Sequence, residues 1–352
     1  MAEAQPLTPA DIRDAYRENP KTRERDLANK LGISEAALVA AHCGDLVTRI
    51  DPHPDTIMGL ACRLGEVMAL TRNESCVHEK VGVYDNYHTG GHAAMVLTEE
   101  IDLRIFLAHW KHAFLVEKHT EEQMRRSVQV FDAAGDAVHK IFLRTTEGHD
   151  VWEVFRKTNA HADQSQEIDT KPRQAPEAPK ADAANADILR KEWARMTDTH
   201  QFMRLTSKLK MNRLGAYRIA GPEFARALSV DAVSRALADV AALGVPVMIF
   251  TGNRGCIQIH TGPIETLRPM GPWQNVMDPR FNLHLRGDHI AEVWAVKKPT
   301  KRGLATSIEA FDADGALILQ IFGVGKEGQD YRQDWADIVS RMPNATEREV
   351  VS

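Results

Sequence analysis

The order of hydrophobic and polar positions changes character twice along the chain, in the same way each time. Helical patterns come first in each half, at residues 24–41 and 54–64 and again at 187–209 and 230–243. Short apolar runs separated by Asn, Gly and Asp follow, and they predict strands at 67–70, 76–83, 104–106, 113–116, 126–131, 137–143, 308–311 and 317–322. Residues 132–136 predict a hairpin turn, and a Trp-bearing helix ends each half. Helices before a series of strands predict an α+β fold with large antiparallel sheets.

A shift of 180 positions brings the two halves of the sequence into register. Thr71 then falls on Thr251, Cys76 on Cys256, and the run 131–133 on the identical run 311–313. This register predicts a tandem repeat, with one domain at 11–157 and a second at 189–341. The segment between them, 158–188, is rich in Ala, Pro, Gln and Asp and predicts a linker. Shared features mostly serve the fold, so function is to be sought where the copies differ.

Composition narrows the class of protein. The 352 residues carry a net charge of −5, whereas general nucleic-acid binders are usually basic. No apolar run approaches the ~20 residues of a membrane span, and the N-terminus lacks a signal-peptide pattern. We therefore expect a cytoplasmic protein without membrane insertion. The four cysteines form no CxxC pair and are expected to be buried reduced thiols.

Three stretches of the sequence imitate functional sites: residues 23–41, the histidines between 78 and 92, and the glycine-containing residues 252–255. Residues 23–41 have the spacing of a helix-turn-helix, but the second helix offers Ser, Glu, Ala and Val where base-reading side chains belong, which favours a structural helical hairpin. His78, His88 and His92 lie near one another in sequence, but the two glycines between His88 and His92 indicate a loop rather than a metal-binding helix, and we expect exposed loop histidines. No phosphate-binding glycine motif is present, and residues 252–255 predict a hairpin turn.

His200 is the histidine that the first copy does not repeat. The rough counterpart of the segment 198–202 is 20–22, which contains Pro, Lys and Thr. The predicted helix places His200 after Trp193 and before Phe202, so its imidazole is expected beside an aromatic side chain on an apolar face. From the residues alone, a structural histidine and a ligand-binding histidine both remain open.

Long segments of the chain resemble one family. In the second copy these are THQF at 199–202, FTGNRGCIQIHTG at 250–262, FNLHLRGDHIAEVWAVKKPT at 281–300 and FDADG at 311–315. In the first copy they are TRNESCVHEKVGVY at 71–84 and IDLRIF at 101–106. These segments are similar to the cytoplasmic hemin-degrading and heme-trafficking proteins of bacterial heme uptake, the HemS/HmuS/ChuS type. The resemblance covers nearly the whole chain except the linker.

The resemblance implies a saddle-like molecule of two similar halves that binds heme b (iron protoporphyrin IX) mainly in the second half. It implies that His200 is the axial iron ligand and that Arg104 is a distal residue acting through a bound water. Phe106 and Phe250 match heme-wall positions, Arg213 and Lys298 match residues that receive the propionates, and Gln320 is a weaker candidate for a polar contact. Phe322 departs from the pattern, because some relatives carry a tyrosine there. Arg104 has His284 as its repeat partner, so this position also differs between the copies.

Two functions follow from the resemblance. The chain either degrades imported hemin as a heme oxygenase with an external electron donor, or carries heme to a separate oxygenase without turnover. An imidazole ligand and a distal arginine suit oxygen chemistry at the ring. A carrier needs the same pocket with exchangeable ligation. The implied partners are heme, an inner-membrane heme importer, and a downstream heme acceptor or reductase; specific nucleic-acid binding is not expected.

Overall fold

The computed structural model describes residues 7–326 and 328–346. Contacts between Cα positions divide the chain into two compact units. Unit 1 comprises Met1–Arg72, Glu79–Gln174 and Asn253–Gln258, and unit 2 comprises Asn73–His78, Ala175–Gly252 and Ile259–Ser352. Strands β3 (Cys76–Val83) and β12 (Cys256–Gly262) each divide between the units, and the chain between the copies divides at Gln174. The predicted boundaries at 157 and 189 stay predictions.

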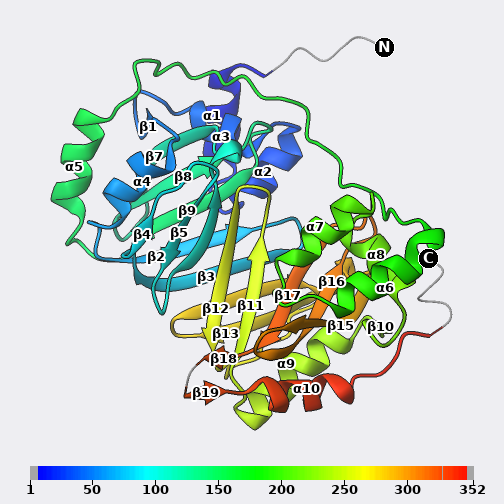
Figure 1. Ribbon diagram of the computed structural model, residues 1–352. Coiled ribbons are helices and arrows are strands. Elements are labelled where there is room, and N and C mark those ends of the chain that lie inside the picture. Colours follow the sequence, from blue (N-terminus) through cyan, green and yellow to red (C-terminus); the bar gives the residue numbers. More distant parts are fainter. Residues whose placement is uncertain (1–6, 327, 347–352) are drawn as a thin grey trace. The chain divides into compact units, whose positions relative to one another are not determined.

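Unit 1 has helices on both faces of an antiparallel sheet with the order β1-β7-β8-β9-β2. Figure 1 shows α1–α3 near β7 and β8. A second group of strands runs β4-β5-β6. The helices are α1 (Pro9–Glu18), α2 (Glu24–Leu31), α3 (Glu35–Ala40), α4 (Pro54–Ala61) and α5 (His149–Thr158). The strands are β1 (Val47–Ile50), β2 (Glu66–Arg72), β4 (Tyr87–His88), β5 (Ala93–Leu97), β6 (Asp102–Phe106), β7 (His112–His119), β8 (Met124–Phe131) and β9 (Ala137–Leu143).

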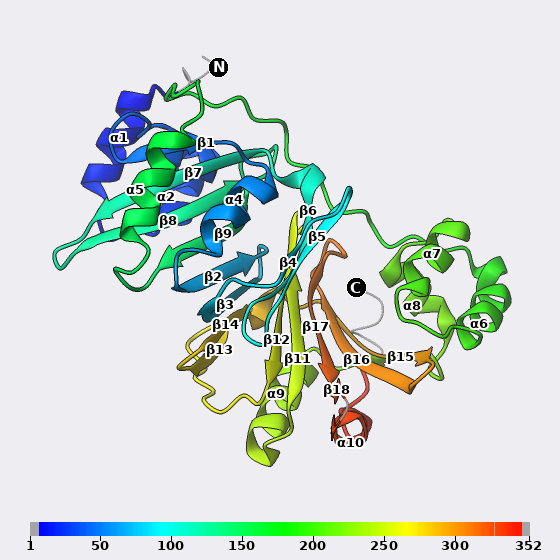
Figure 2. The ribbon, with the colours of Figure 1, turned by 60° about the vertical axis from the view of Figure 1, so that its left-hand side comes forward.

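Unit 2 repeats this plan with the order β10-β15-β16-β17-β11 and a separate pair β13-β14. Figure 2 shows α6–α8 as one group, apart from α9 and α10. The helices are α6 (Ala186–Ala194), α7 (Gln201–Lys208), α8 (Arg213–Ala220), α9 (Ala232–Leu243) and α10 (Arg332–Ser340). The strands are β10 (Ala225–Leu228), β11 (Val247–Gly252), β13 (Trp273–Asp278), β14 (Phe281–Arg286), β15 (Glu292–Thr300), β16 (Gly303–Phe311), β17 (Leu317–Gly323), β18 (Gly325–Lys326) and β19 (Gln329–Asp330).

The predicted α+β tandem repeat is confirmed by this element order. Strand β2 begins 181 positions and ends 180 positions before β11, and β7, β8 and β9 precede β15, β16 and β17 by about the same shift. The hairpin turns are equivalent as well. Asp132 accepts hydrogen bonds from the backbone of Ala134 and Asp136, and Asp312 accepts from Asp314 and Ala316. The glycine of each turn has a positive φ, 78° and 83°, which an L side chain adopts with strain.

Successive side chains of a strand point to opposite faces of the sheet, and the two faces pack against different helices. In β11 every second residue is buried, and Val247 and Ile249 join the core formed with α9 and α10. The opposite face carries Trp294, Val296 and Phe311, which form a second core with α6, α7 and α8. Unit 2 is therefore a sheet with a helical layer on either side.

The helical hairpin predicted at 23–41 is confirmed, because Gly32 adopts a left-handed conformation after α2 and Ser34 caps α3. Several other local predictions were wrong. The stretch 187–209, predicted as one helical segment, is two helices, α6 and α7. His78 lies buried in β3 instead of in an exposed loop, and Cys62 is exposed whereas the other three cysteines are buried. In the described part of the chain, no helix is long and apolar enough to cross a membrane.

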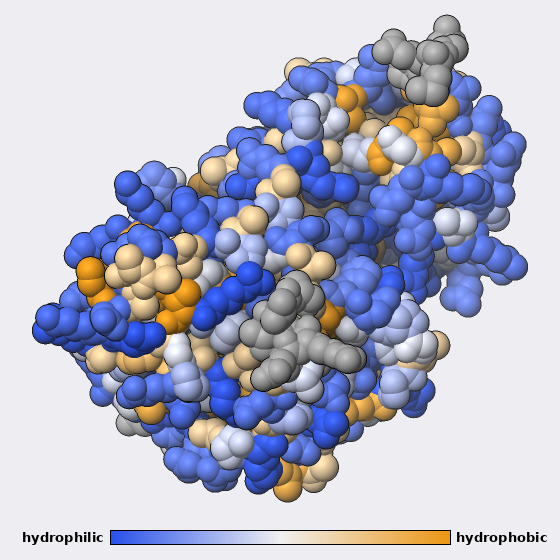
Figure 3. Space-filling view, turned by 90° about the vertical axis from the view of Figure 1, so that its right-hand side faces the viewer, coloured by the Kyte–Doolittle hydropathy of each residue, from blue (hydrophilic) through white to orange (hydrophobic). Residues whose placement is uncertain are grey.

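The segment between the two copies is attached to both units. Arg49 donates hydrogen bonds to the carboxylate of Asp163 and to the backbone oxygens of Ser165 and Glu167 in unit 1. In unit 2, the Asn212 side chain accepts from the backbone of Lys180. The face of the molecule in Figure 3 is mostly hydrophilic, with small hydrophobic areas between hydrophilic residues.

Candidate ligand-binding site

His200 stands at the N-cap of α7, and its side chain is 93% exposed. Asp198 accepts two hydrogen bonds from it, one from the backbone N–H at 2.8 Å and one from the ring Nδ1 at 2.7 Å. These two bonds, the backbone bond first, lower the pKa of Asp198. Because a carboxylate only accepts, Nδ1 carries the proton and Nε2 of the neutral ring keeps its lone pair. The imidazole is therefore exposed and held in one orientation by Asp198, not packed on an apolar face as the sequence suggested.

Helix α7 is anchored by its opposite side. Phe202 is buried against Trp193, with ring centroids 4.5 Å apart, and belongs to the core below α6–α8. Met203 lies three positions after His200, which places both on one side of the helix start. The sulfur of Met203 is 3.5 Å from Nη2 of Arg213. His200 thus lies on the side of α7 that faces Arg213.

Arg213 and Lys298 meet at a buried carboxylate, Glu309. Arg213 Nη1 donates to Glu309 Oε2 at 2.8 Å, and Lys298 Nζ donates to Oε1 at 2.7 Å. Tyr217 and Ser307 donate to the same carboxylate at 2.9 Å each. The side chain of Glu309 is 0% exposed, that of Lys298 3% and that of Arg213 23%. Two cations therefore share one carboxylate, and Arg213 is the member that reaches the surface.

Burial and the neighbouring opposite charges shift the pKa values of the side chains in this cluster in opposite directions. Burial raises the pKa of Glu309, but Lys298 and Arg213 outweigh it and lower the pKa to about 2. Burial, assisted by Arg213, lowers the pKa of Lys298 to about 8 although Glu309 opposes the shift. The pKa of Arg213 is raised, because Tyr217 and Glu309 outweigh the effect of its burial. At neutral pH the cluster holds two positive charges and one negative charge.

Phe250, Gln320 and Phe322 lie beside this cluster on the same face of the sheet. Gln320 is directly opposite Phe250 on β11 and opposite Glu309 on β16, and directly opposite residues share a face. Phe250 and Phe322 form an edge-to-face pair with centroids 5.3 Å apart. All three side chains are half-buried. Unit 2 therefore brings together five of the predicted site residues: Arg213, Phe250, Lys298, Gln320 and Phe322.

The helices around His200 are strongly basic for an acidic protein. Residues 186–220 contain eight Lys and Arg against three Asp and Glu, whereas the matched residues 6–40 contain six of each. The positive excess belongs to the second copy alone. It provides a favourable field for an anionic ligand.

The remaining predicted residues, Arg104 and Phe106, belong to unit 1. As alternate residues of β6 they share a face. The Arg104 side chain is 34% exposed and forms an ion pair with Asp102. Phe106 is half-buried at the end of the strand. The guanidinium of Arg104 is thus partly neutralised and still accessible to solvent.

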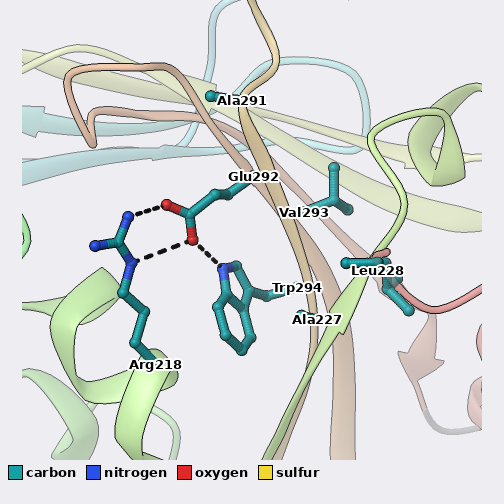
Figure 4. A pocket seen from close by; sticks show the side chains of 8 residues that line it. Arg218, Ala227, Leu228, Ala291, Glu292, Val293 and Trp294 are labelled. Atoms are coloured by element: carbon teal, nitrogen blue, oxygen red, sulfur yellow. Dashed lines mark hydrogen bonds and ion pairs between the residues drawn. The ribbon is translucent and has the colours of Figure 1, made fainter. Parts of the chain in front are cut away.

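Figure 4 shows a pocket of about 250 Å³ on β10 and β15 of unit 2. Its charged side chains bind one another, because Arg218 pairs with Glu292 and the indole of Trp294 donates to Glu292 at 3.0 Å. None of the predicted site residues lines it. Among the residues that the structure describes, no group of three His, Cys, Asp or Glu side chains is arranged to hold a metal ion.

Sequence reasoning missed Asp198, Tyr217 and Glu309. A signal existed for Glu309, because its repeat partner at 129 is Gln. Asp198 precedes His200 by two residues, a spacing that allows its carboxylate to accept from the backbone of His200. Tyr217 carries no comparable signal, since a tyrosine on an amphipathic helix is usually part of the core.

The chain belongs to the family described as the haemin-degrading HemS.ChuX domain, whose model matches residues 32–158 and 210–342. It is 38% identical over 333 residues to the hemin transport protein HmuS of Yersinia pestis, covering 94% of this chain and 95% of that protein. It is 37% identical over 331 residues to the hemin transport protein HemS of Yersinia enterocolitica, with the same coverage. The predicted family is therefore confirmed.

Solved structures agree with this family. The holo form of PhuS, a heme-binding protein from Pseudomonas aeruginosa, superimposes with a TM-score of 0.91 at 39% identity, covering 96% of this chain and all of PhuS. The heme-degrading enzyme ChuS of Escherichia coli O157:H7 superimposes with a TM-score of 0.85 at 32% identity, covering 94% of this chain and 97% of ChuS. The likeness extends over both copies of the repeat.

Proposed function

We propose that this chain binds heme b in bacterial heme uptake, with His200 as the axial ligand of the iron. The observation that carries the proposal is the exposed imidazole whose Nδ1 is held by Asp198 at 2.7 Å. Metal-binding histidines almost always donate their second ring N–H to a carboxylate or a similar acceptor, which orients the free nitrogen toward the metal. Family membership and the heme-binding relatives support the same ligand.

The other residues of unit 2 fit an iron porphyrin. Arg213 and Lys298 offer positive charge to the propionates, and Phe250 and Phe322 offer aromatic surface to the ring. Phe322 has no hydroxyl, so it packs without donating a hydrogen bond. Gln320 beside them can supply a polar contact. A bound heme would supply the iron that His200 ligates.

Arg104 and Phe106 are proposed to act from unit 1, as the family resemblance implies. Arginine stays protonated and has no lone pair to give, so Arg104 acts on a ligand of the iron and not on the iron itself. Its ion pair with Asp102 limits the number of side-chain conformations available to the guanidinium. Phe106 adds apolar surface on the same face of β6.

We propose a cytoplasmic protein that receives heme from an inner-membrane importer and degrades it with electrons from a reductase. The relatives support both roles of this proposal, since HmuS and HemS are named as transport proteins and ChuS as a heme-degrading enzyme. The rival function is a pure carrier that delivers heme to a separate oxygenase.

A titration with hemin tests the ligand assignment. His200→Ala is expected to abolish or greatly weaken the complex with a histidine-type Soret band, because no other group on that side of α7 presents an aligned imidazole among the described residues. His92→Ala, at an exposed histidine of unit 1, is the matched control and should leave the titration unchanged. An unaltered Soret spectrum and affinity in His200→Ala would contradict the proposal.

Turnover separates the enzyme from the carrier. The purified hemin complex is exposed to oxygen and a reductant, with catalase present to remove free peroxide. Release of CO with one defined linear tetrapyrrole supports the enzyme. Heme that stays intact under these conditions supports the carrier.

A further inference from the structure

The hydrogen bonds of Glu309 are evenly divided between its two oxygens. Oε2 accepts from Arg213 at 2.8 Å and from Tyr217 at 2.9 Å, and Oε1 accepts from Lys298 at 2.7 Å and from Ser307 at 2.9 Å. A carboxylate has about four acceptor positions, so these donors use its full capacity. Its orientation is therefore fixed from four directions, and so are the positions of the two cations that it binds.

The first copy balances the same face differently. There Lys118 pairs with Glu24 at 3.2 Å, and Lys140 pairs with Glu35. Two carboxylates thus neutralise two lysines. The residue at the place of Glu309 is Gln129, which is buried and uncharged.

In the second copy the carboxylate lies on a strand instead of a helix, and the first residue of the equivalent helix is positive instead of negative. The first residue after the N-cap is Glu35 in α3 but Arg213 in α8. The strand position of Lys140 is occupied by Gln320. Glu309 is consequently the single carboxylate shared by Arg213 and Lys298, and the cluster keeps an excess of one positive charge.

The geometry directs this excess charge outward through Arg213. Lys298 is buried below the ring of Phe202, with its Nζ 4.9 Å from the ring centroid. Arg213 is partly exposed, and its Nη2 faces the thioether of Met203, which is a weak acceptor. An incoming carboxylate that displaced this sulfur would complete the charge balance. Without Glu309, the two cations would repel each other in a buried setting.

We propose that Glu309 is a positioning residue that holds Arg213 and Lys298 together as a receptor for a ligand carboxylate. The inference rests on the proposed function, because the carboxylates concerned are the propionates of heme. Glu309 acts through the two cations and does not touch the ligand. It also explains why a negative residue lies at the centre of a site that is proposed to bind an anion.

The test compares two ligands that differ only in their carboxylates, hemin and hemin dimethyl ester. Dissociation constants are measured by Soret titration of the full chain for the wild type and for Glu309→Gln. The preference for hemin over its ester is expected to fall about tenfold in Glu309→Gln, the scale of one charge-assisted hydrogen bond. The affinity for the ester and the Soret band set by His200 should stay unchanged.

Glu35→Gln is the matched control, because it removes a buried carboxylate from its lysine in the other copy. It should leave the preference for hemin unchanged. An equal or greater preference for hemin in Glu309→Gln overturns the inference, since Glu309 would then compete with the ligand for Arg213. Absence of a histidine-type complex with either ligand in the wild type refutes the proposed function instead.

If Glu309→Gln fails to fold, Tyr217→Phe decides the question. The Tyr217 hydroxyl bonds to Glu309 and accepts from Lys298 at 2.9 Å. Its removal loosens the carboxylate without removing its charge, so the preference for hemin should fall about threefold. An unchanged preference in a folded Tyr217→Phe overturns the inference.

Discussion

Replacing Lys298 and replacing Glu309 should have very different effects on stability, although the two side chains form one ion pair. Glu309→Gln leaves the buried Lys298 and the partly exposed Arg213 without their shared counterion. The pKa of Glu309 is lowered from 4.5 to about 2, and at ~1.4 kcal/mol per pKa unit this corresponds to a loss on the order of 3 kcal/mol. Loss of one partner of a buried ion pair usually costs ~3–5 kcal/mol, which agrees with this magnitude.

Lys298→Met removes a cation whose burial is unfavourable. The pKa of Lys298 is lowered to about 8 despite the nearby carboxylate, so its charged form is held at a cost. Glu309 keeps Arg213, Tyr217 and Ser307 as donors after the change. We therefore expect the stability of Lys298→Met to lie within about 1 kcal/mol of the wild type at pH 7.

The two variants are compared by urea unfolding at pH 7 followed by circular dichroism. Hydrogen exchange of the β16 amides assigns the change to unit 2. A destabilisation of Lys298→Met as large as that of Glu309→Gln would refute the reasoning, because the cluster would then behave as a simple pair with one cation and not as a carboxylate with two.

The pH dependence of the free energy of unfolding follows from the pKa shifts of Lys298 and Glu309. Between about 8 and 10.5 the unfolded chain binds more protons at Lys298 than the folded chain does, so the contribution of Lys298 to stability rises with pH in this window. Below 4.5 the contribution of Glu309 is lost progressively as pH falls toward about 2. Glu309 and Arg213 are the charged groups that face Lys298, together with the hydroxyl of Tyr217. The wild type should therefore gain stability relative to Lys298→Met above pH 8 and lose it relative to Glu309→Gln in acid.

Three further variants test separate parts of the argument. Asp198→Ala frees the Nδ1 of His200 and should weaken hemin binding about tenfold in a Soret titration; an unchanged affinity would mean that the carboxylate does not orient the ring. Arg104→Ala should change hemin affinity by no more than roughly threefold while altering the ferric spin state and turnover, and identical spectra and rates would leave Arg104 without a role at the iron. Lys210 has a φ of 56°, so Lys210→Gly should stabilise unit 2 by about 0.5–1 kcal/mol in urea unfolding, and a loss of stability would contradict the strain.

The sequence predicted most of the fold because its signals are local. The hairpins at 132–136 and 312–316 are defined by Asp and Gly at fixed positions, and alternation defines strands such as β2 and β11. The four-residue strands β1 and β10 were missed because four residues are too few for a periodic pattern. The division between α6 and α7 was missed because no Gly or Pro occurs between them and the turn depends on Asp198 bonding to the backbone of His200.

Candidate site residues could be singled out where the two copies differ in residue type. They could not be recognised where the proposed role of a residue depends on its pairing across strands. His200 was singled out because the first copy has no histidine at that place; in the structure its counterpart at the N-cap of α2 is Arg23. Glu309 also differs between the copies, since its repeat partner at 129 is Gln, but only the register that sets it opposite Gln320 and below Arg213 suggests the role proposed for it.

The repeat also accounts for the presence of the proposed anion site in the second copy. Carboxylates and lysines in equal numbers attract no further charge, and this is the arrangement around Lys118, which is partly exposed, and Lys140, which is buried. Removing one carboxylate from such a face would leave a cation buried without a partner, which is costly. Sharing Glu309 between Lys298 and the more exposed Arg213 avoids that cost and leaves one positive charge for a ligand. Ligand binding could thus arise in one copy by a redistribution of charge, while the core beneath it stayed the same.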